Sequence, residues 1–269
     1  MNGFIRFALV RGLVASTIGL ILSGSASAFD DLGQRATWAP PSAEQAKEQV
    51  DAWLADQTLT EAQSSRIEAI WLDTESLQSG QALLDAVVTT LAVADQRARD
   101  IVLLCEGRRE FVTTPQFEML DDESVAPLVR NNLRLHYGGW LTQQRLFDEA
   151  LGVLDGLDPD QVIDPVSLLF YKSAAHHFLM DKEKGLEALA RLLERENDLP
   201  RRYRDVARLM QTDLASLEAD SLDEISRLMN DIERRLDFGR SGTRVLREED
   251  DVIAKLDRMI EELENAAGS

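Results

Sequence analysis

The chain has 269 residues and a formal net charge of −19, because 48 aspartates and glutamates outnumber 29 lysines and arginines. Such an acidic surface repels nucleic acid and anionic lipid, since proteins hold both of them with cationic side chains. The composition therefore argues against nucleic-acid binding, and it suits a solvated surface, a divalent cation or a basic partner.

Residues 1–28 have the pattern of a secretory signal peptide. Arg6 and Arg11 supply a positive start, an apolar segment follows over 12–22, and Ala26-Ser27-Ala28 forms an A-x-A cleavage site. The apolar segment is shorter than the roughly 20 residues of a membrane-spanning helix. We therefore expect export to the periplasm or the cell exterior with cleavage after Ala28. An uncleaved amino-terminal membrane anchor is the alternative.

Residues 29–41 are expected to be extended, because Pro40-Pro41 excludes a helix and restricts the residue before it. Apolar residues recur at helical spacing through residues 42–238, which predicts a helical, repeat-like domain. Ser42 opens a capping-box pattern for the first helix, and a second short helix is expected from Thr60.

Residues 81–94 are strongly apolar and rich in β-branched side chains, which leaves a strand open, but their length and spacing favour a helix. Asp95 is placed to cap the next helix, which runs to about Cys105. Residues 107–123 are expected to be irregular. The pattern is clearest over 127–196, where helix pairs joined by short turns are typical of an α-hairpin array.

Pro200 and Ser221 are expected to begin two more helices, and a final amphipathic helix is predicted over 244–265 with a short tail after it. The apolar residues of the final helix recur at intervals of seven, three, four and three: Leu246, Ile253, Leu256, Ile260 and Leu263. This seam is shorter than the three to four heptads of a coiled coil. The helix therefore docks on the body of the protein, or it binds a partner or a second copy.

Residues 140–159 resemble a tetratricopeptide repeat. Phe147 precedes the segment Asp148-Glu149-Ala150-Leu151, and the unit closes at Leu157-Asp158-Pro159. Arg145 lies near the turn where this family has glycine. A second unit spans 168–193. The resemblance implies an α-solenoid that binds other proteins.

A longer resemblance, to a family of exported helical bacterial proteins with such hairpins, extends over three segments. They are Val129-Arg130-Asn131-Asn132-Leu133-Arg134, the stretch from Asp164 to Tyr171, and Leu199-Pro200-Arg201-Arg202-Tyr203. Residues 225–236 and 256–262 are similar as well. This resemblance implies an envelope location and carries over no catalytic residue.

No catalytic, cofactor-binding or metal site is predicted. The sequence lacks the G-x-S-x-G, H-E-x-x-H, phosphate-loop and EF-hand patterns. His177 and Asp181 are four residues apart and could share a metal, but no further ligand is spaced to complete a zinc site. Cys105, the one cysteine, lies in an apolar run and is expected to be a buried thiol, with Arg108 and Arg109 leaving a redox role open.

The sequence thus predicts an all-α, tetratricopeptide-like α-hairpin array (an α-solenoid) with an amphipathic carboxyl-terminal helix. It is expected to act as an interaction scaffold in the cell envelope, without catalysis or cofactor. The expected partner is another protein, and a basic one would suit the acidic surface of this chain. Self-association through 244–265 is the alternative, followed by an envelope hydrolase. The candidate partner-binding residues lie on the concave side of 127–196 and on the last helix: Tyr137, Trp140, Gln144, Tyr171, His177, Ile253 and Ile260.

Overall fold

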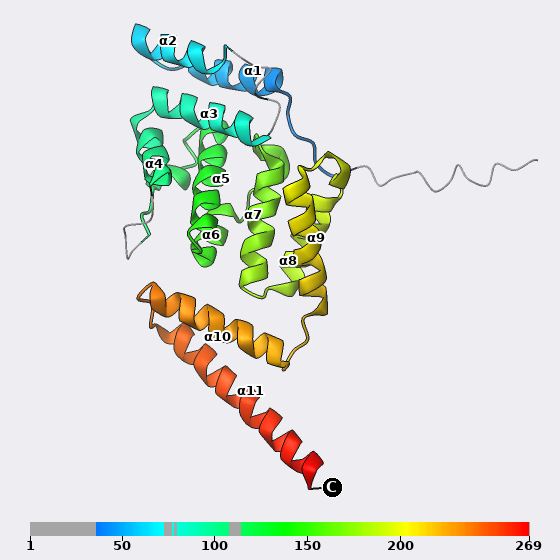
Figure 1. Ribbon diagram of the computed structural model, residues 1–269. Coiled ribbons are helices and arrows are strands. Elements are labelled where there is room, and N and C mark those ends of the chain that lie inside the picture. The colour runs from blue at the N-terminus through cyan, green and yellow to red at the C-terminus, as the bar shows by residue number, and fades with distance from the viewer. Residues whose placement is uncertain (1–35, 73–76, 78–79, 108–113, 269) are drawn as a thin grey trace, which may run out of the picture. The chain divides into compact units, whose positions relative to one another are not determined.

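The computed structural model describes residues 36–72, 77, 80–107 and 114–268, and every regular element in these ranges is a helix (Figure 1). The expected all-α fold class is therefore confirmed for the described residues. The predicted signal peptide, the start of the expected extended segment and Arg108-Arg109 lie outside them. Residues 36–41 contain no helix. In the part of the chain that the structure describes, no helix combines the length and apolarity needed to cross a bilayer.

The amino-terminal helices begin at the capping residues that the sequence indicates. Ser42 and Thr60 accept hydrogen bonds from the backbone three residues on, and both form complete capping boxes. Asp95 caps the fourth helix by accepting from the backbone N–H of Arg97. Each such cap contributes about 1 kcal/mol. The four helices are α1 (Ala43–Leu54), α2 (Glu61–Ile70), α3 (Gly80–Ala94) and α4 (Gln96–Glu106).

The apolar segment 81–94 lies within α3, so its interpretation as a helix is confirmed. Helix α3 contacts α1, α2, α4, α5 and α7, and is therefore enclosed on most of its sides. Leu84, Val87 and Leu91 are each at most 2% exposed. Full burial of one such side chain contributes about 1.5–3 kcal/mol. A helix in this position needs no polar face, which explains its almost continuous apolar sequence.

Two helical hairpins and a further helix form the central part of the chain. Helix α5 packs on α6, α7 packs on α8, α6 contacts α7, and α8 contacts α9. Pro127 and Pro165 occupy the first positions of α5 and α7, where a missing N–H costs nothing. The helices are α5 (Pro127–Gln143), α6 (Phe147–Leu154), α7 (Pro165–Phe178), α8 (Lys182–Leu193) and α9 (Arg201–Ser216).

The turns of both hairpins hold a non-glycine residue in the left-handed conformation. The φ angle is 61° at Arg145 and 58° at Met180. In each turn the following N–H bonds the carbonyl five residues back, as in a Schellman motif. A side chain in this conformation costs about 1–2 kcal/mol. Arg145 and Met180 therefore adopt a backbone conformation that only glycine adopts without this cost.

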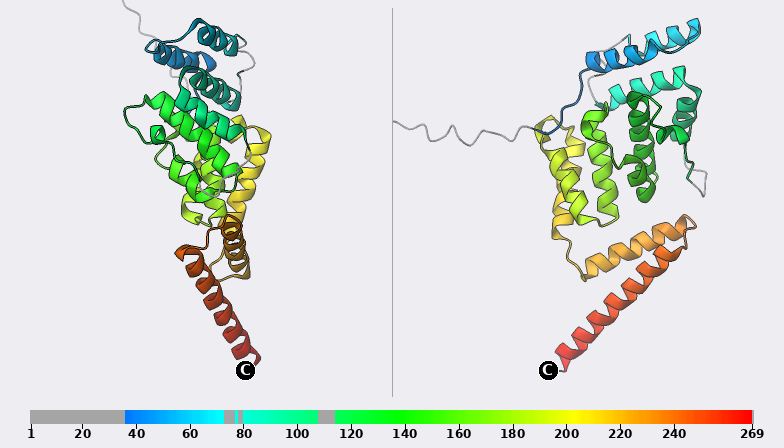
Figure 2. Two further views of the ribbon diagram at one scale, coloured as in Figure 1. Left: turned by 90° about the vertical axis from the view of Figure 1, so that its left-hand side faces the viewer. Right: turned by 180° about the vertical axis from the view of Figure 1, so that it is seen from behind.

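The last two helices, α10 (Leu222–Asp237) and α11 (Thr243–Ala267), form a third hairpin. Helix α11 continues two residues beyond the expected position 265, so Ala266 and Ala267 of the expected tail are helical. Helix α10 lies across the turn ends of the α5–α6 and α7–α8 hairpins (Figure 2). The hairpin has a small apolar cluster of its own, made of Ile225, Ile232, Val245 and Val252.

Candidate functional site

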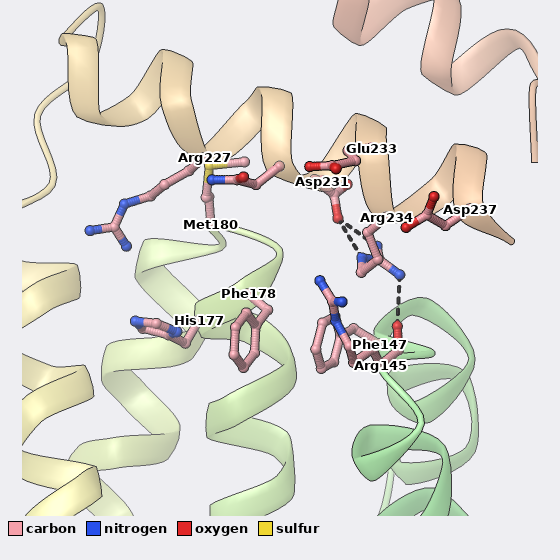
Figure 3. Close-up of a pocket in the computed structure, with 11 residues that line it drawn as sticks. Arg145, Phe147, His177, Phe178, Met180, Arg227, Asp231, Glu233, Arg234 and Asp237 are labelled. Carbon is pink, nitrogen blue, oxygen red and sulfur yellow. Dashed lines mark hydrogen bonds and ion pairs between the residues drawn. The ribbon is translucent and has the colours of Figure 1, made fainter. Parts of the chain in front are cut away.

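A cavity of about 370 Å³ lies where α10 crosses the turns at Arg145 and Met180 (Figure 3). One wall is aromatic, because the rings of Phe147 and Phe178 stack with their centroids 4.5 Å apart. The guanidinium of Arg234 lies 5.0 Å from the centroid of the Phe147 ring, a cation–π distance. The remaining wall is charged and comes mostly from α10: Arg227, Asp231, Glu233 and Asp237.

Buried charges hold α10 in this position. Asp231 accepts hydrogen bonds from Arg234 Nη2 at 2.5 Å and from Arg235 Nε at 2.6 Å. Arg234 Nη1 also donates to the carbonyl oxygen of Arg145 at 2.8 Å. All three side chains of this ion-pair group are at most 6% exposed. Charged groups are buried in this way only when they are paired, so the group depends on each of its members.

The same network reaches α6 and α11 through Asp148. This carboxylate lies 2.8 Å from Arg235 Nη1 and 2.7 Å from Arg244 Nη1. Burial acts to raise the pKa of Asp148, but the hydrogen bond and charge of Arg235 outweigh it and lower the pKa below its ordinary value. Glu149 pairs with Arg240 beside it. The contacts between the third hairpin and α6 are therefore largely ionic.

A second charged group joins α7, α9 and α10. Arg227 donates to both carboxylate oxygens of Asp213, at 2.6 and 2.8 Å, and His177 Nε2 lies 2.6 Å from Asp213 Oδ2. The hydrogen bond from Arg227 is the main cause that lowers the pKa of Asp213 to about 2. Asp181, the expected neighbour of His177, instead lies 3.3 Å from Nδ1 of His176. Among the described residues, no three His, Cys, Asp or Glu side chains gather closely enough to hold a metal ion.

The other candidate binding residues on 127–196 lie largely in the interior. Tyr137 is 2% exposed and donates its hydroxyl to the Pro115 carbonyl at 2.7 Å, and Trp140 is 5% exposed. Tyr171 is half-buried, and its hydroxyl accepts from Gln143. Gln144 is half-buried at the end of α5. These side chains therefore present little common surface to a partner.

Cys105 lies beside His136 in a small cavity of about 90 Å³. Burial raises the pKa of the Cys105 thiol to about 12, so the reactive thiolate is absent at neutral pH. Burial also lowers the pKa of His136. This pair therefore lacks the electrostatics of a nucleophilic site.

The third hairpin exposes seven large apolar side chains, which we call the hairpin face. On α11, Ile253 is 57% exposed and Ile260 is 53% exposed. A groove of about 570 Å³ runs between the two helices and is lined by Met229, Leu236 and Ile253. The hairpin face consists of Leu222, Met229, Leu236, Leu246, Ile253, Ile260 and Leu263, each at least 46% exposed.

The contribution of α10 to this surface was missed from the sequence, although a signal is present. Leu222, Met229 and Leu236 are seven residues apart, as are Leu246, Ile253 and Ile260 on α11. The seven-residue spacing places each set on one side of its helix. Two such stripes on antiparallel neighbours form the hairpin face.

No family model matches the chain, and neither a curated protein nor a solved structure matches it.

Proposed function

We propose that the chain is an exported protein-interaction scaffold of the cell envelope, built from tetratricopeptide-like hairpins and without a catalytic role. The signal-peptide pattern of residues 1–28 supports export. The shared turn geometry at Arg145 and Met180 supports a repeat relation between the α5–α6 and α7–α8 hairpins. Most charged groups of the cavity beside α10 already pair with one another, which leaves few of them to act on a substrate.

The single observation that carries the binding function is the hairpin face. Covering one leucine or isoleucine contributes about 1.5–3 kcal/mol, so a partner that covers several of these side chains gains substantially. Monomeric proteins rarely expose large groups of apolar side chains around a groove, and Met229, Leu236 and Ile253 line one here. The two stripes with seven-residue spacing favour a helical segment of another protein as the occupant.

Site-specific photo-crosslinking in the native envelope tests this function. A crosslinking residue at position 253 is expected to form a discrete adduct with another protein, and the adduct should disappear in an Ile260→Asp background. The control position is Leu103, which is 56% exposed on α4 and lies outside the hairpin face. Equal adducts from positions 253 and 103, or none from either, would contradict the proposal.

Self-association is the second candidate, because Leu246, Ile253 and Ile260 have the spacing of one side of a coiled coil. Sedimentation equilibrium of the chain that begins at Phe29 tests it. A dimer that the Ile253→Asp substitution dissociates would favour self-association. A monomer at all concentrations would exclude self-association as the function.

A further inference from the structure

The charges around the hairpin face identify the kind of partner that fits it. We propose that the occupant is an amphipathic helix of another protein that carries lysine or arginine along the edges of its apolar stripe. This inference rests on the proposed function, because it specifies the partner of the same surface.

The charged residues that line the groove of the hairpin face are all acidic. Glu233 and Asp237 line the groove from α10, and Glu249 lines it from α11. Further carboxylates follow the α11 stripe along its outer edge, and all of them are exposed: Asp250, Asp257, Glu261 and Glu264. Among the described residues, none of these carboxylates has a basic side chain at ion-pair distance.

The basic residues of the same hairpin are engaged elsewhere. Lys255 binds Asp220 and Glu224 at 2.9 Å, and Arg258 binds Asp220 at 2.8 Å. Five more pair with carboxylates of α6, α9, α10 or α11: Arg227, Arg234, Arg235, Arg240 and Arg244. Arg247 instead donates to the carbonyl oxygen of Thr243 in its own helix. The formal charges that line the groove are therefore all negative.

This charge distribution disfavours a second copy of the chain as the occupant. A symmetric contact would bring the acidic border of one copy against the same border of the other, and like charges that meet across an interface oppose binding. A helix with basic edges would instead meet unpaired carboxylates on both sides of its apolar stripe.

The groove also sets the size of the occupant. The α10 stripe runs from Leu222 to Leu236, and Ile253 faces Met229 and Leu236 across the groove. A partner helix that follows this stripe needs two heptads, or about 14 residues and about 21 Å. Its apolar residues would enter between α10 and α11 and complete a three-helix arrangement.

Two synthetic peptides of three heptads test the proposal with the full chain from Phe29. Both carry the same leucine and isoleucine stripe, one with lysine at the edge positions and the other with glutamate. Fluorescence anisotropy is expected to show at least about tenfold tighter binding of the lysine peptide, with weaker binding as salt rises from about 0.05 to about 0.5 M.

Charge variants of the protein supply the matched control. The Asp257→Asn/Glu261→Gln variant is expected to weaken binding of the lysine peptide several-fold, because it removes two border charges and no apolar contact. The Glu48→Gln/Glu68→Gln variant removes two exposed carboxylates of α1 and α2 and should bind as the unaltered chain does. Ile253→Asp should abolish binding while circular dichroism shows unchanged helicity.

Equal binding of both peptides, or no binding of either, would overturn the basic-helix proposal. A partner that still crosslinks at position 253 would then show that the scaffold function stands and that its partner has another chemistry. A stable dimer that Ile253→Asp dissociates would overturn the proposal in favour of a second copy.

Discussion

At the scale of single residues, Met180 shows how a turn keeps its geometry without glycine. The residue is half-buried with a φ of 58°, a conformation that penalises any side chain with a Cβ. Arg145 holds the equivalent place in the preceding hairpin. Both turns are therefore strained at one residue. The hydrogen bonds of the Schellman-type turn stabilise this conformation.

We expect Met180→Gly to be more stable than Met180→Ala by about 1 kcal/mol, because both remove the side chain and only glycine removes the left-handed penalty. Urea unfolding followed by circular dichroism measures the difference. Ala175 lies buried inside α7 and is the control, since Ala175→Gly should be destabilising by at least about 1 kcal/mol. The proposed strain would be refuted if the alanine variant of Met180 were the more stable one.

At the scale of the helices, α10 reverses the usual arrangement of a surface helix. It buries Asp231, Arg234 and Arg235 against the body of the protein, while Met229 and Leu236 are 54% and 46% exposed. The paired charges act beside an apolar contact, because Phe238 directly after α10 packs against the main core. They fix the position of α10, because the buried charges compensate one another only when each lies next to its partner.

We expect Asp231→Ala to be destabilising by about 3–5 kcal/mol, since it removes the carboxylate closest to two buried arginines and leaves them to share Asp148. The loss should appear in hydrogen exchange as faster exchange over α10 and α11. Asp51→Ala breaks an exposed pair with Lys47 and serves as the control, with an expected cost of no more than about 0.5 kcal/mol. Equal losses of unfolding free energy for the two substitutions would show that the buried ion pairs stabilise the protein no more than an exposed pair does.

The helices could be predicted from the sequence because their signals are local. Ser42, Thr60, Asp95 and Ser221 cap helices within three residues of themselves, and the two prolines at helix starts act on their own backbone. The position of the candidate site, in contrast, could not be predicted from such local signals. Whether Arg235 is solvated or buried depends on Asp148, which lies far away in the sequence.

The same difference explains the fate of the candidate binding residues. The spacing of Ile253 and Ile260 marks one side of a helix, and the structure places both at the surface. Tyr137 and Trp140 also share a side of their helix, but α5 is covered there by other parts of the chain. Helical spacing shows which residues lie together, and only the tertiary contacts decide which of them are covered.

At the scale of the whole molecule, three apolar clusters are joined to different extents. The first spans α1 to α7, the second spans α7 to α9 with Trp38, and the third is confined to α10 and α11. Ionic groups around Asp148 and Asp213 connect the third cluster to the others. The attachment of the last hairpin consequently depends on ionised carboxylates and should weaken in acid.

We expect the stability difference between the unaltered chain and Asp213→Asn to disappear in acid. The pKa of Asp213 is lowered to about 2 in the folded protein, below its ordinary value of 3.8, so the ionised carboxylate stabilises the fold above pH 3.8. This contribution is lost as pH falls from 3.8 towards 2. Thermal unfolding of both proteins between pH 7 and pH 2 measures it.

Asp160→Asn is the control, because Asp160 is exposed and has no ion pair among the described residues. It should change the unfolding temperature little at any pH in this range. A difference for Asp213→Asn that stays constant down to pH 2 would contradict the role assigned to the Asp213 pair.

The ion pairs between α6 and the last hairpin also imply an order of assembly. Arg244 and Asp148 are separated by 96 positions, whereas the apolar cluster of α10 and α11 forms between near neighbours. Contacts between distant residues require a long loop to close, so they form late unless other contacts have already brought the ends together. The last hairpin should thus fold on its own and dock on the rest of the protein in the last step of folding. Its hairpin face would then already be exposed to a binding partner.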